Sequence, residues 1–471
     1  MVFTSTAFLA FYAAVFTLYW LLSRAPRARQ LQNALLLVGS YYFYGFVHPW
    51  FCLLIASSTV VDYACGLAMG RFPRARHAWL VVSLAFNLGL LGVFKYYDFF
   101  AKSFADAAGL FGWELQPIEL LLVLPVGISF YTFQTLSYTI DVYRGQLQPR
   151  RNLFDFAVFV SFFPQLVAGP IERASRFLPQ LEQVRRWSWA ALFPALELIV
   201  GGYLKKLVVA DNVGTYVDEI FELQAPTLAL LAVGTLGFAV QIYADFSAYT
   251  DIARGIAKLL GFDLIRNFRS PYLAVSPSDF WRRWHISFSS WIRDYLYIPL
   301  GGSRVRTPLG FLGVLLVSLG LSGLWHGAAW NFVLWGVYHA LLVFAYHQLK
   351  LGGRWEPRSR PSRAISISVM FVWTLLGWLL FRTGDIAWLG GALRHSPVGM
   401  SGVDGSAAAY TLALVLLYSS PMAVQGLVER LPSAAASSLG AFLRGAFLAA
   451  ALVAITLFAG DGSNDFIYFR F

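Results

Sequence analysis

Long apolar runs alternate with short polar segments along nearly the whole chain. A helix needs roughly 17–25 predominantly apolar residues to cross a bilayer, and such runs recur from one end of the sequence to the other. We therefore predict an all-α, polytopic membrane protein with about twelve transmembrane helices. The predicted spans are Ala7–Leu22, Leu31–Phe46, Phe51–Met69, Ala78–Phe94, Ile118–Tyr138, Ala190–Ala210, Leu228–Phe246, Leu309–Trp325, Asn331–His347, Ile365–Phe381, Tyr410–Met422 and Ala441–Phe458.

The cations between these runs predict how the helices are oriented. Lys and Arg in short loops stay on the cytoplasmic side, and Arg24, Arg27 and Arg29 lie in the first loop. Alternate threading from there also places the basic stretches 254–306 and 350–363 inside. Both termini are therefore expected on the outer side.

One apolar segment does not read as a simple span. Leu153–Ile171 has arginines on both sides and contains Pro164, Gly169 and Pro170. Irregular backbone at membrane depth is tolerated only where it is buried in protein or lines a cavity. We predict a re-entrant element here, beside a cavity, within one membrane domain that spans residues 1–471.

Composition narrows the class further. Of the 471 residues 58% are hydrophobic and 13% charged, about half the charge of an average soluble protein, which is about 25%. The net charge of +11 is spread between apolar runs rather than over a phosphate-binding face, so no nucleic-acid partner is expected. Cys52 and Cys65 have no metal-ligand spacing around them, and we expect no metal.

His326 lies in the string LSGLWHGAAWN, at the end of one predicted span and the start of the next. Small residues there let helices approach closely, and an imidazole inside a membrane region is a functional hypothesis by default. Two interpretations remain open: a reactive group, or a core histidine bonded to a neighbouring carbonyl.

His285 lies in DFWRRWHISFSSWIRDYL. On a continuous helix, Trp281, Trp284, His285, Phe288 and Trp291 would share one face, which predicts an amphipathic helix at the inner interface. Anchoring is the simpler interpretation. The segment also offers guanidinium, imidazole and hydroxyl groups to a phosphate-bearing cytosolic ligand.

Other templates are absent or less supported. The chain has no P-loop, no GxSxG, no HExxH and no CxxC motif. His339 and His347 are expected to be structural. Carboxylates within or beside the spans favour a competing class, a transporter with a proton relay; they are Asp62, Asp141, Asp245 and Asp251.

At the two histidines the sequence resembles the membrane-bound O-acyltransferases, in the branch of bacterial alginate O-acetylation. The strings DFWRRWHISFSSWIRDYLYIPLGGSR (Asp279–Arg304) and LSGLWHGAAWNFVLWGVYHA (Leu321–Ala340) carry the resemblance. Further strings support it along most of the chain: FKYYDFF, LPVGISFYTFQTLSYTIDVYRG, FFPQLVAGPIER, QIYADFSAYTDIARGIAKLLGF and the closing FIYFRF.

The resemblance implies a ring of transmembrane helices around a central tunnel, which an acyl donor enters from the cytosol. It implies that His326 is catalytic and that His285 is the second motif histidine, either a catalyst or a tunnel-lining group. An imidazole, with an ordinary pKa of about 6.5, suits removal of a hydroxyl proton near neutrality. The residues expected to bind substrate are Arg282, Arg283, Trp284, Ser287, Arg293, Asp294, Trp325 and Asn331.

The same resemblance implies an enzyme of the bacterial inner membrane with no permanently bound cofactor. We expect acetyl-coenzyme A as the donor, although a carrier-protein thioester remains open. The expected acceptor is a periplasmic or membrane-anchored acetyltransferase partner, which passes the acetyl group to alginate or a related exopolysaccharide. Peptidoglycan O-acetylation and teichoic-acid D-alanylation are the alternatives.

Overall fold

The computed structural model describes residues 1–351, 357, 359–395, 402–431, 437–459 and 466–467. The chain forms two compact units, Met1–Ala191 with Ile256–Ile265 and Leu192–Gly255 with Arg266–Phe471. Every regular element in the described residues is helical, so the all-α prediction is confirmed. A single membrane domain over residues 1–471 stays a prediction, because the two compact units are described separately.

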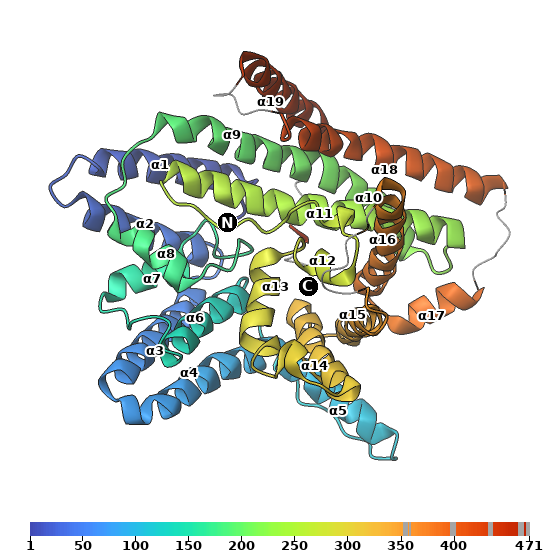
Figure 1. Ribbon diagram of the computed structural model, residues 1–471, viewed down its shortest axis with the longest axis horizontal. Coiled ribbons are helices and arrows are strands. Elements are labelled where there is room, and N and C mark those ends of the chain that lie inside the picture. The colour runs from blue at the N-terminus through green and yellow to red at the C-terminus, as the bar shows by residue number, and fades with distance from the viewer. Residues whose placement is uncertain (352–356, 358, 396–401, 432–436, 460–465, 468–471) are drawn as a thin grey trace. The chain divides into compact units, whose positions relative to one another are not determined.

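The first unit is built around three mutually packed helices, α3, α4 and α6 (Figure 1). They share a buried polar cluster in which Ser83 and Asn87 of α4 donate hydrogen bonds to the Asp62 carboxylate of α3. The helices of this unit are α1 (Thr6–Leu22), α2 (Ala28–Gly45), α3 (Phe51–Arg71), η1 (Pro73–Ala75), α4 (Arg76–Leu91), η2 (Gly92–Tyr96), α5 (Tyr97–Gly109), α6 (Ile128–Tyr143), α7 (Leu153–Ser161) and α8 (Ala174–Glu182).

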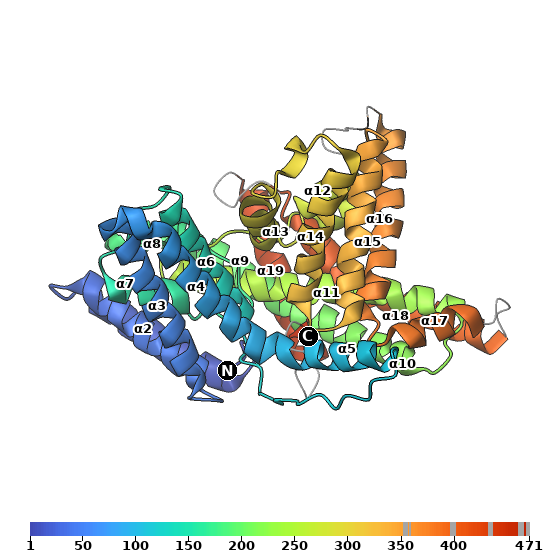
Figure 2. The same cartoon turned by 90° about the horizontal axis from the view of Figure 1, so that it is seen from below.

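The second unit contains both predicted site histidines. Its helices α14, α15 and α16 run side by side (Figure 2). The helices that begin in or enter this unit are α9 (Trp189–Tyr203), η3 (Leu204–Ala210), α10 (Asp211–Glu222), α11 (Leu228–Leu259), η4 (Pro271–Leu273), α12 (Pro277–Trp281), α13 (Ile286–Ile292), η5 (Arg293–Tyr297), η6 (Gly302–Arg304), α14 (Pro308–His326), α15 (Trp330–Gln348), α16 (Arg360–Arg382), α17 (Ile386–His395), α18 (Gly402–Val428) and α19 (Ser438–Phe458).

Seven helical stretches among the described residues are long and apolar enough to cross a membrane. They are Phe51–Arg71, Pro73–Gly109, Leu228–Leu259, Pro308–His326, Arg360–Arg382, Gly402–Val428 and Ser438–Phe458. The protein is therefore a multi-pass membrane protein, and the larger number of about twelve crossings stays a prediction. Part of the basic stretch predicted at 350–363 lies outside the described residues, and its last four residues begin α16.

The span predicted at Ile118–Tyr138 is wrong in its first half. Residues 118–127 of this span are not helical, and α6 begins only at Ile128. Pro125 and the left-handed Gly127, at φ +83°, prevent the helix from starting earlier. A side chain at Gly127 would also meet the Leu166 carbonyl at 2.8 Å, so two requirements select glycine at this position.

The re-entrant element predicted at Leu153–Ile171 is a short helix, α7, followed by turns. Its irregular part is buried, and Gln165 donates a hydrogen bond to the Phe159 carbonyl across the turn at 3.1 Å. Gly169 packs so closely on Gln165 that a Cβ there would lie 2.3 Å from its Cα. Burial in protein is what irregular backbone at membrane depth requires. That the element re-enters the membrane and that a cavity lies beside it both stay predictions.

Candidate active site

The α14–α15 hairpin positions His326. Thr307 caps α14 by accepting a hydrogen bond from the Gly310 amide, and Pro308 occupies the first helical position. Facing glycines bring the two helices together: a Cβ on Gly323 would lie 2.0 Å from the Phe332 carbonyl oxygen, and one on Gly336 would lie 2.2 Å from that of Leu319. This close approach fixes the end of α14, where His326 is the last helical residue.

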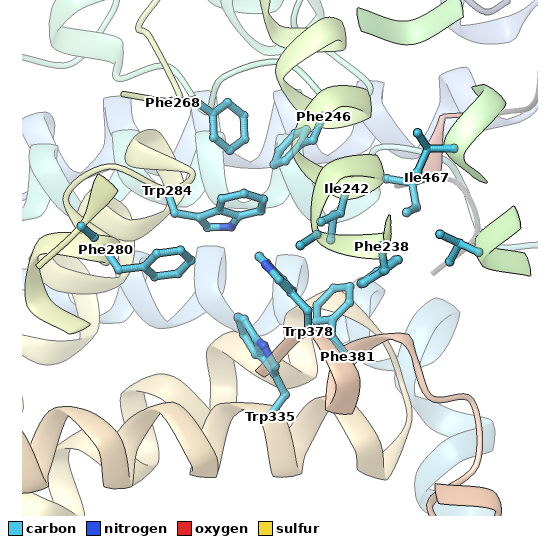
Figure 3. Packing of buried hydrophobic residues seen from close by; sticks show 14 of the residues in the cluster. Phe238, Ile242, Phe246, Phe268, Phe280, Trp284, Trp335, Trp378, Phe381 and Ile467 are labelled. Carbon is cyan, nitrogen blue, oxygen red and sulfur yellow. The ribbon is translucent and has the colours of Figure 1, made fainter. Parts of the chain in front are cut away.

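Four aromatic side chains surround the His326 imidazole. Its ring centroid lies 5.0 Å from Trp325, 5.7 Å from Phe288, and 5.2 Å from both Trp335 and Phe381. Figure 3 shows Trp335 and Phe381 within a cluster of buried rings that α15 and α16 share with α11 and α12. The imidazole is buried, with 6% of the residue exposed. We call Trp325, Phe288, Trp335 and Phe381 the aromatic box.

The amphipathic interfacial helix predicted around His285 is wrong. The chain breaks between α12 and α13, and His285 precedes α13 with a left-handed backbone at φ +40°. The break turns His285 into the interior, where the residue is fully buried. A helix-period pattern of aromatic residues was satisfied by core packing of two short helices instead of by one surface helix.

Asn267 holds this break in place, and sequence reasoning missed it. Its backbone carbonyl accepts a hydrogen bond from the Ile286 amide at 2.9 Å, and its side-chain oxygen accepts one from the Ser287 amide at 3.2 Å. Asn267 is itself fully buried. Two first-turn amides of α13 are thereby satisfied. The only sequence signal was a lone amide residue among apolar and basic neighbours.

His285 and His326 share two aromatic neighbours. The His285 ring lies 5.1 Å from Phe288 and 5.8 Å from Trp325, and both of those rings also contact His326. Phe246 of α11 contacts His285 edge-on at 4.6 Å. Burial lowers the pKa of His285 to about 3, because an apolar setting disfavours the charged imidazole. His285 is therefore neutral at physiological pH.

A cavity of about 460 Å³ adjoins the aromatic box. Its volume is typical of small-molecule sites, which range over roughly 300–1,000 Å³. Arginine, serine, aromatic and aliphatic side chains all contribute to its wall. The lining residues are Ser278, Trp281, Arg282, Ile286, Phe288, Ser289, Ser290, Ile292, Arg293, Tyr297, Leu315, Ser318, Leu319, Ser322 and Val343. This amphipathic lining suits a ligand with an anionic end and an apolar or thioester arm.

Two of the predicted binding arginines line the cavity, and the third does not. The side chains of Arg282 and Arg293 are 59% and 60% exposed and pair with Asp279 at 3.8 Å and Asp294 at 2.8 Å. Such exposed pairs exchange partners at little cost. Arg283 instead pairs with Asp279 at 2.9 Å and lies outside the cavity lining.

Three further predicted binding residues occupy packing positions. Trp284 is buried and packs against both Phe280 and Trp378 (Figure 3). Asn331 donates to the Thr383 carbonyl at 2.8 Å and so ties α15 to the end of α16. Ser287 is buried beside Asn267. These three residues support the site's shape and are not among the residues that line the cavity.

A buried charge network on η3 and α11 was also missed. Lys206 pairs with Asp245 at 2.8 Å and with Asp211 at 2.9 Å, while Lys205 pairs with Asp251 at 2.5 Å. Asp245 further accepts a hydrogen bond from the Ile467 amide at 2.6 Å. The signal was two adjacent lysines inside an apolar run. Asp245 and Asp251, invoked for a proton relay, are thus neutralised by lysines.

Comparison with known proteins identifies the family of the chain. The profile of the MBOAT, membrane-bound O-acyltransferase family, matches residues 146–380, which include both histidines. The chain is 38% identical over 395 residues to the probable alginate O-acetylase AlgI of Pseudomonas aeruginosa, a match that covers 82% of this chain and 74% of that protein. It is 33% identical over 427 residues to the peptidoglycan O-acetyltransferase of Helicobacter pylori, covering 84% and 79%.

A more distant similarity extends to another cell-wall enzyme. The teichoic acid D-alanyltransferase of Bacillus subtilis is 28% identical over 277 residues, covering 55% of this chain and 69% of that protein. The names of all three relatives describe transfer of an acyl group. The chain belongs to the membrane-bound O-acyltransferase family and is a multi-pass membrane acyltransferase.

Proposed function

We propose that the protein O-acetylates an extracytoplasmic polysaccharide, alginate or a related exopolysaccharide, with a cytosolic thioester as donor. One observation carries the chemistry: a buried imidazole, His326, ends a helix next to an amphipathic cavity of about 460 Å³. Similarity to alginate O-acetylases over 82% of this chain supports the acceptor class. The donor is acetyl-coenzyme A.

In this proposal His326 acts as the general base. It takes the proton of the acceptor hydroxyl while the hydroxyl oxygen attacks the thioester carbonyl carbon. The new C–O bond forms, the C–S bond breaks, and the leaving thiolate receives the proton that the imidazole holds. The aromatic box keeps water away from the thioester and so protects the donor from hydrolysis.

Neutral His285 has a different role. Its left-handed backbone, followed by the Ile286 and Ser287 amides that donate to Asn267, directs α13 and therefore Phe288 toward His326. We infer that it is a positioning residue at the side of the aromatic box, and that Arg282 and Arg293 receive the phosphates of the donor. Guanidinium forks bind phosphate oxygens in pairs.

The working arrangement follows from the charge pattern of the loops. About twelve crossings surround a tunnel in the bacterial inner membrane, and both termini face outward. The donor stays on the cytosolic side because an anionic coenzyme cannot enter the hydrocarbon cheaply. Its acetyl arm reaches His326, and a membrane-anchored or periplasmic acetyltransferase accepts the acetyl group from the outer side.

Two related functions remain as second candidates because similar proteins are named for them. They are O-acetylation of peptidoglycan and D-alanylation of teichoic acid. Alginate is preferred because five alginate O-acetylases match at 36–38% identity. Membership of an acyltransferase family decides against the transporter alternative.

Sided vesicles test the proposal. Protein of known orientation is reconstituted with an outer-face acetyltransferase acceptor and given labelled acetyl-coenzyme A on the cytoplasmic face only. Label should appear on the acceptor while free coenzyme A stays on the cytoplasmic side. The same label presented on an acyl carrier protein distinguishes the two donor types. Transfer that requires donor and acceptor on one face would refute the proposed sidedness.

A further inference from the structure

The cavity and the His326 imidazole do not meet directly. Phe288 and Ser322 belong to the cavity wall, whereas His326 and Trp325 do not. Ser322 lies one helical turn before His326 on α14. The Phe288 ring is therefore the part of the wall that faces the cavity while also contacting the imidazole, at 5.7 Å between ring centroids.

The Phe288 ring is stacked closely against the Trp325 ring. The two rings lie 4.2 Å apart between centroids at an interplanar angle of 26°. Both residues are buried, at 1% and 3% exposure. A stacked aromatic pair at this separation leaves no gap for an alkyl chain, since carbon atoms in contact already sit roughly 3.5–4.0 Å apart.

We propose that Phe288, backed by Trp325, is the specificity-determining residue that limits the transferred acyl group to acetyl. This inference rests on the proposed function. In this proposal an acyl arm in the cavity passes the Phe288 ring to reach His326. A methyl group needs a small displacement of that ring, whereas a propyl chain needs the ring to leave its stack on Trp325.

The backbone under Phe288 makes the ring an effective limit. α13 starts from the left-handed His285, and Asn267 accepts two of its first amide hydrogen bonds. Phe288 therefore cannot retreat by a shift of the helix without breaking those contacts. The restriction falls on side-chain rotation within a packed interior, where neighbours resist added volume.

The predicted selectivity follows from the chemistry of the transfer. For each donor the thioester C–S bond breaks, the acceptor oxygen takes the acyl carbon, and the thiol leaves with the proton passed by His326. Only the length of the acyl chain differs between donors. A pocket discriminates one methylene by roughly tenfold to two-hundredfold, so two extra methylenes in butyryl suffice for a strong preference.

The test compares acetyl- and butyryl-coenzyme A with purified, reconstituted protein and its hydroxyl acceptor. Wild type should prefer acetyl by about a hundredfold or more in kcat/KM. Phe288→Ala should reduce that preference at least tenfold by admitting butyryl. Phe288→Leu, which keeps more packing, should give an intermediate ratio and serves if the alanine variant does not fold.

Phe311→Ala is the matched control. Phe311 is a buried aromatic of α14 that packs near Ala340 and the lining residue Leu315 but does not itself line the cavity. Its substitution leaves Phe288 and Trp325 in place and should therefore leave the donor ratio unchanged. If both Phe288 variants fold and still transfer acetyl, an unchanged ratio of acetyl to butyryl kcat/KM in them would overturn the inference. Absence of transfer from any thioester by wild type would instead overturn the proposed function and this inference with it.

Discussion

His326 ends a 19-residue helix that packs tightly against its neighbour, whereas His285 lies in a break between two short helices. Both imidazoles contact Phe288 and Trp325. The regular hairpin holds His326 at a helix end beside the cavity, and the irregular segment locks His285 deeper, fully buried and neutral. In the proposed function the two histidines of this aromatic cluster therefore have different roles, His326 as the base and His285 as a positioning residue.

Separating the two helices of the α14–α15 hairpin should have the largest effect on the site around His326. Gly323→Ala places a Cβ 2.0 Å from the Phe332 carbonyl oxygen, a backbone atom that cannot swing aside. We expect a destabilisation on the order of 1–3 kcal/mol, measured as a lower thermal midpoint in detergent. We also expect near-complete loss of acetylation in a transfer assay. Gly320→Ala on the same helix, where an added Cβ meets nothing, should be close to wild type.

The next test separates the backbone role of His285 from its imidazole. His285→Ala should lower kcat by about a hundredfold, because a small misplacement near reacting atoms costs about that much. His285→Asn should lose less, since Asn tolerates the left-handed backbone at φ +40°. Equal losses in the two variants, with both proteins folded, would assign the effect to the imidazole itself.

The pH dependence of stability tests whether His285 is buried as a neutral imidazole. The pKa of His285 is lowered to about 3 in the folded protein, so below pH 6.5 the unfolded chain binds a proton that the native protein excludes. Stability is therefore lost as pH falls, by about 2 kcal/mol between pH 6.5 and pH 5. His285→Asn should flatten this slope in thermal melts; an equally steep slope in the variant would contradict the burial argument.

The smallest expected effects lie at the cavity rim. Arg293→Gln removes one exposed charge that pairs with Asp294, and we expect a rise in the donor KM of a few fold with little change in kcat. The rise should shrink at high salt, because exposed charges are screened there. Arg283→Gln, at an arginine outside the cavity lining, provides the comparison; an equal rise in KM would remove the rim from donor binding.

The sequence predicted the helical membrane fold and the α14–α15 hairpin because both follow from local signals. Long apolar runs and the small residues around His326 need no knowledge of distant partners. The break at His285 depends on Asn267 and on rings from α11 and α16, which no local pattern reveals. The late start of α6 was readable in principle, since Pro125 and Gly127 stand inside the predicted span.

The Lys206–Asp245 pair is another tertiary contact that no local sequence pattern predicts. Its members are far apart in the chain, and the sequence shows only a pair of adjacent lysines and a separate carboxylate, each in an apolar run. Only the fold reveals that they neutralise each other and that Asp245 holds the Ile467 amide. Predicting a proton relay from Asp245 was therefore reasonable from the sequence, and the missing information was a tertiary contact.

The most direct measurement compares acetyl transfer by His326→Ala with transfer by His347→Ala, a control at an exposed histidine on α15. Both proteins are purified, their thermal midpoints are checked, and transfer from acetyl-coenzyme A to the acceptor is timed. Loss of a general base lowers the rate by roughly 10²–10⁴-fold, so we predict a loss in that range for folded His326→Ala and near wild-type transfer for His347→Ala. Wild-type transfer by folded His326→Ala would contradict the assignment of His326 as the base.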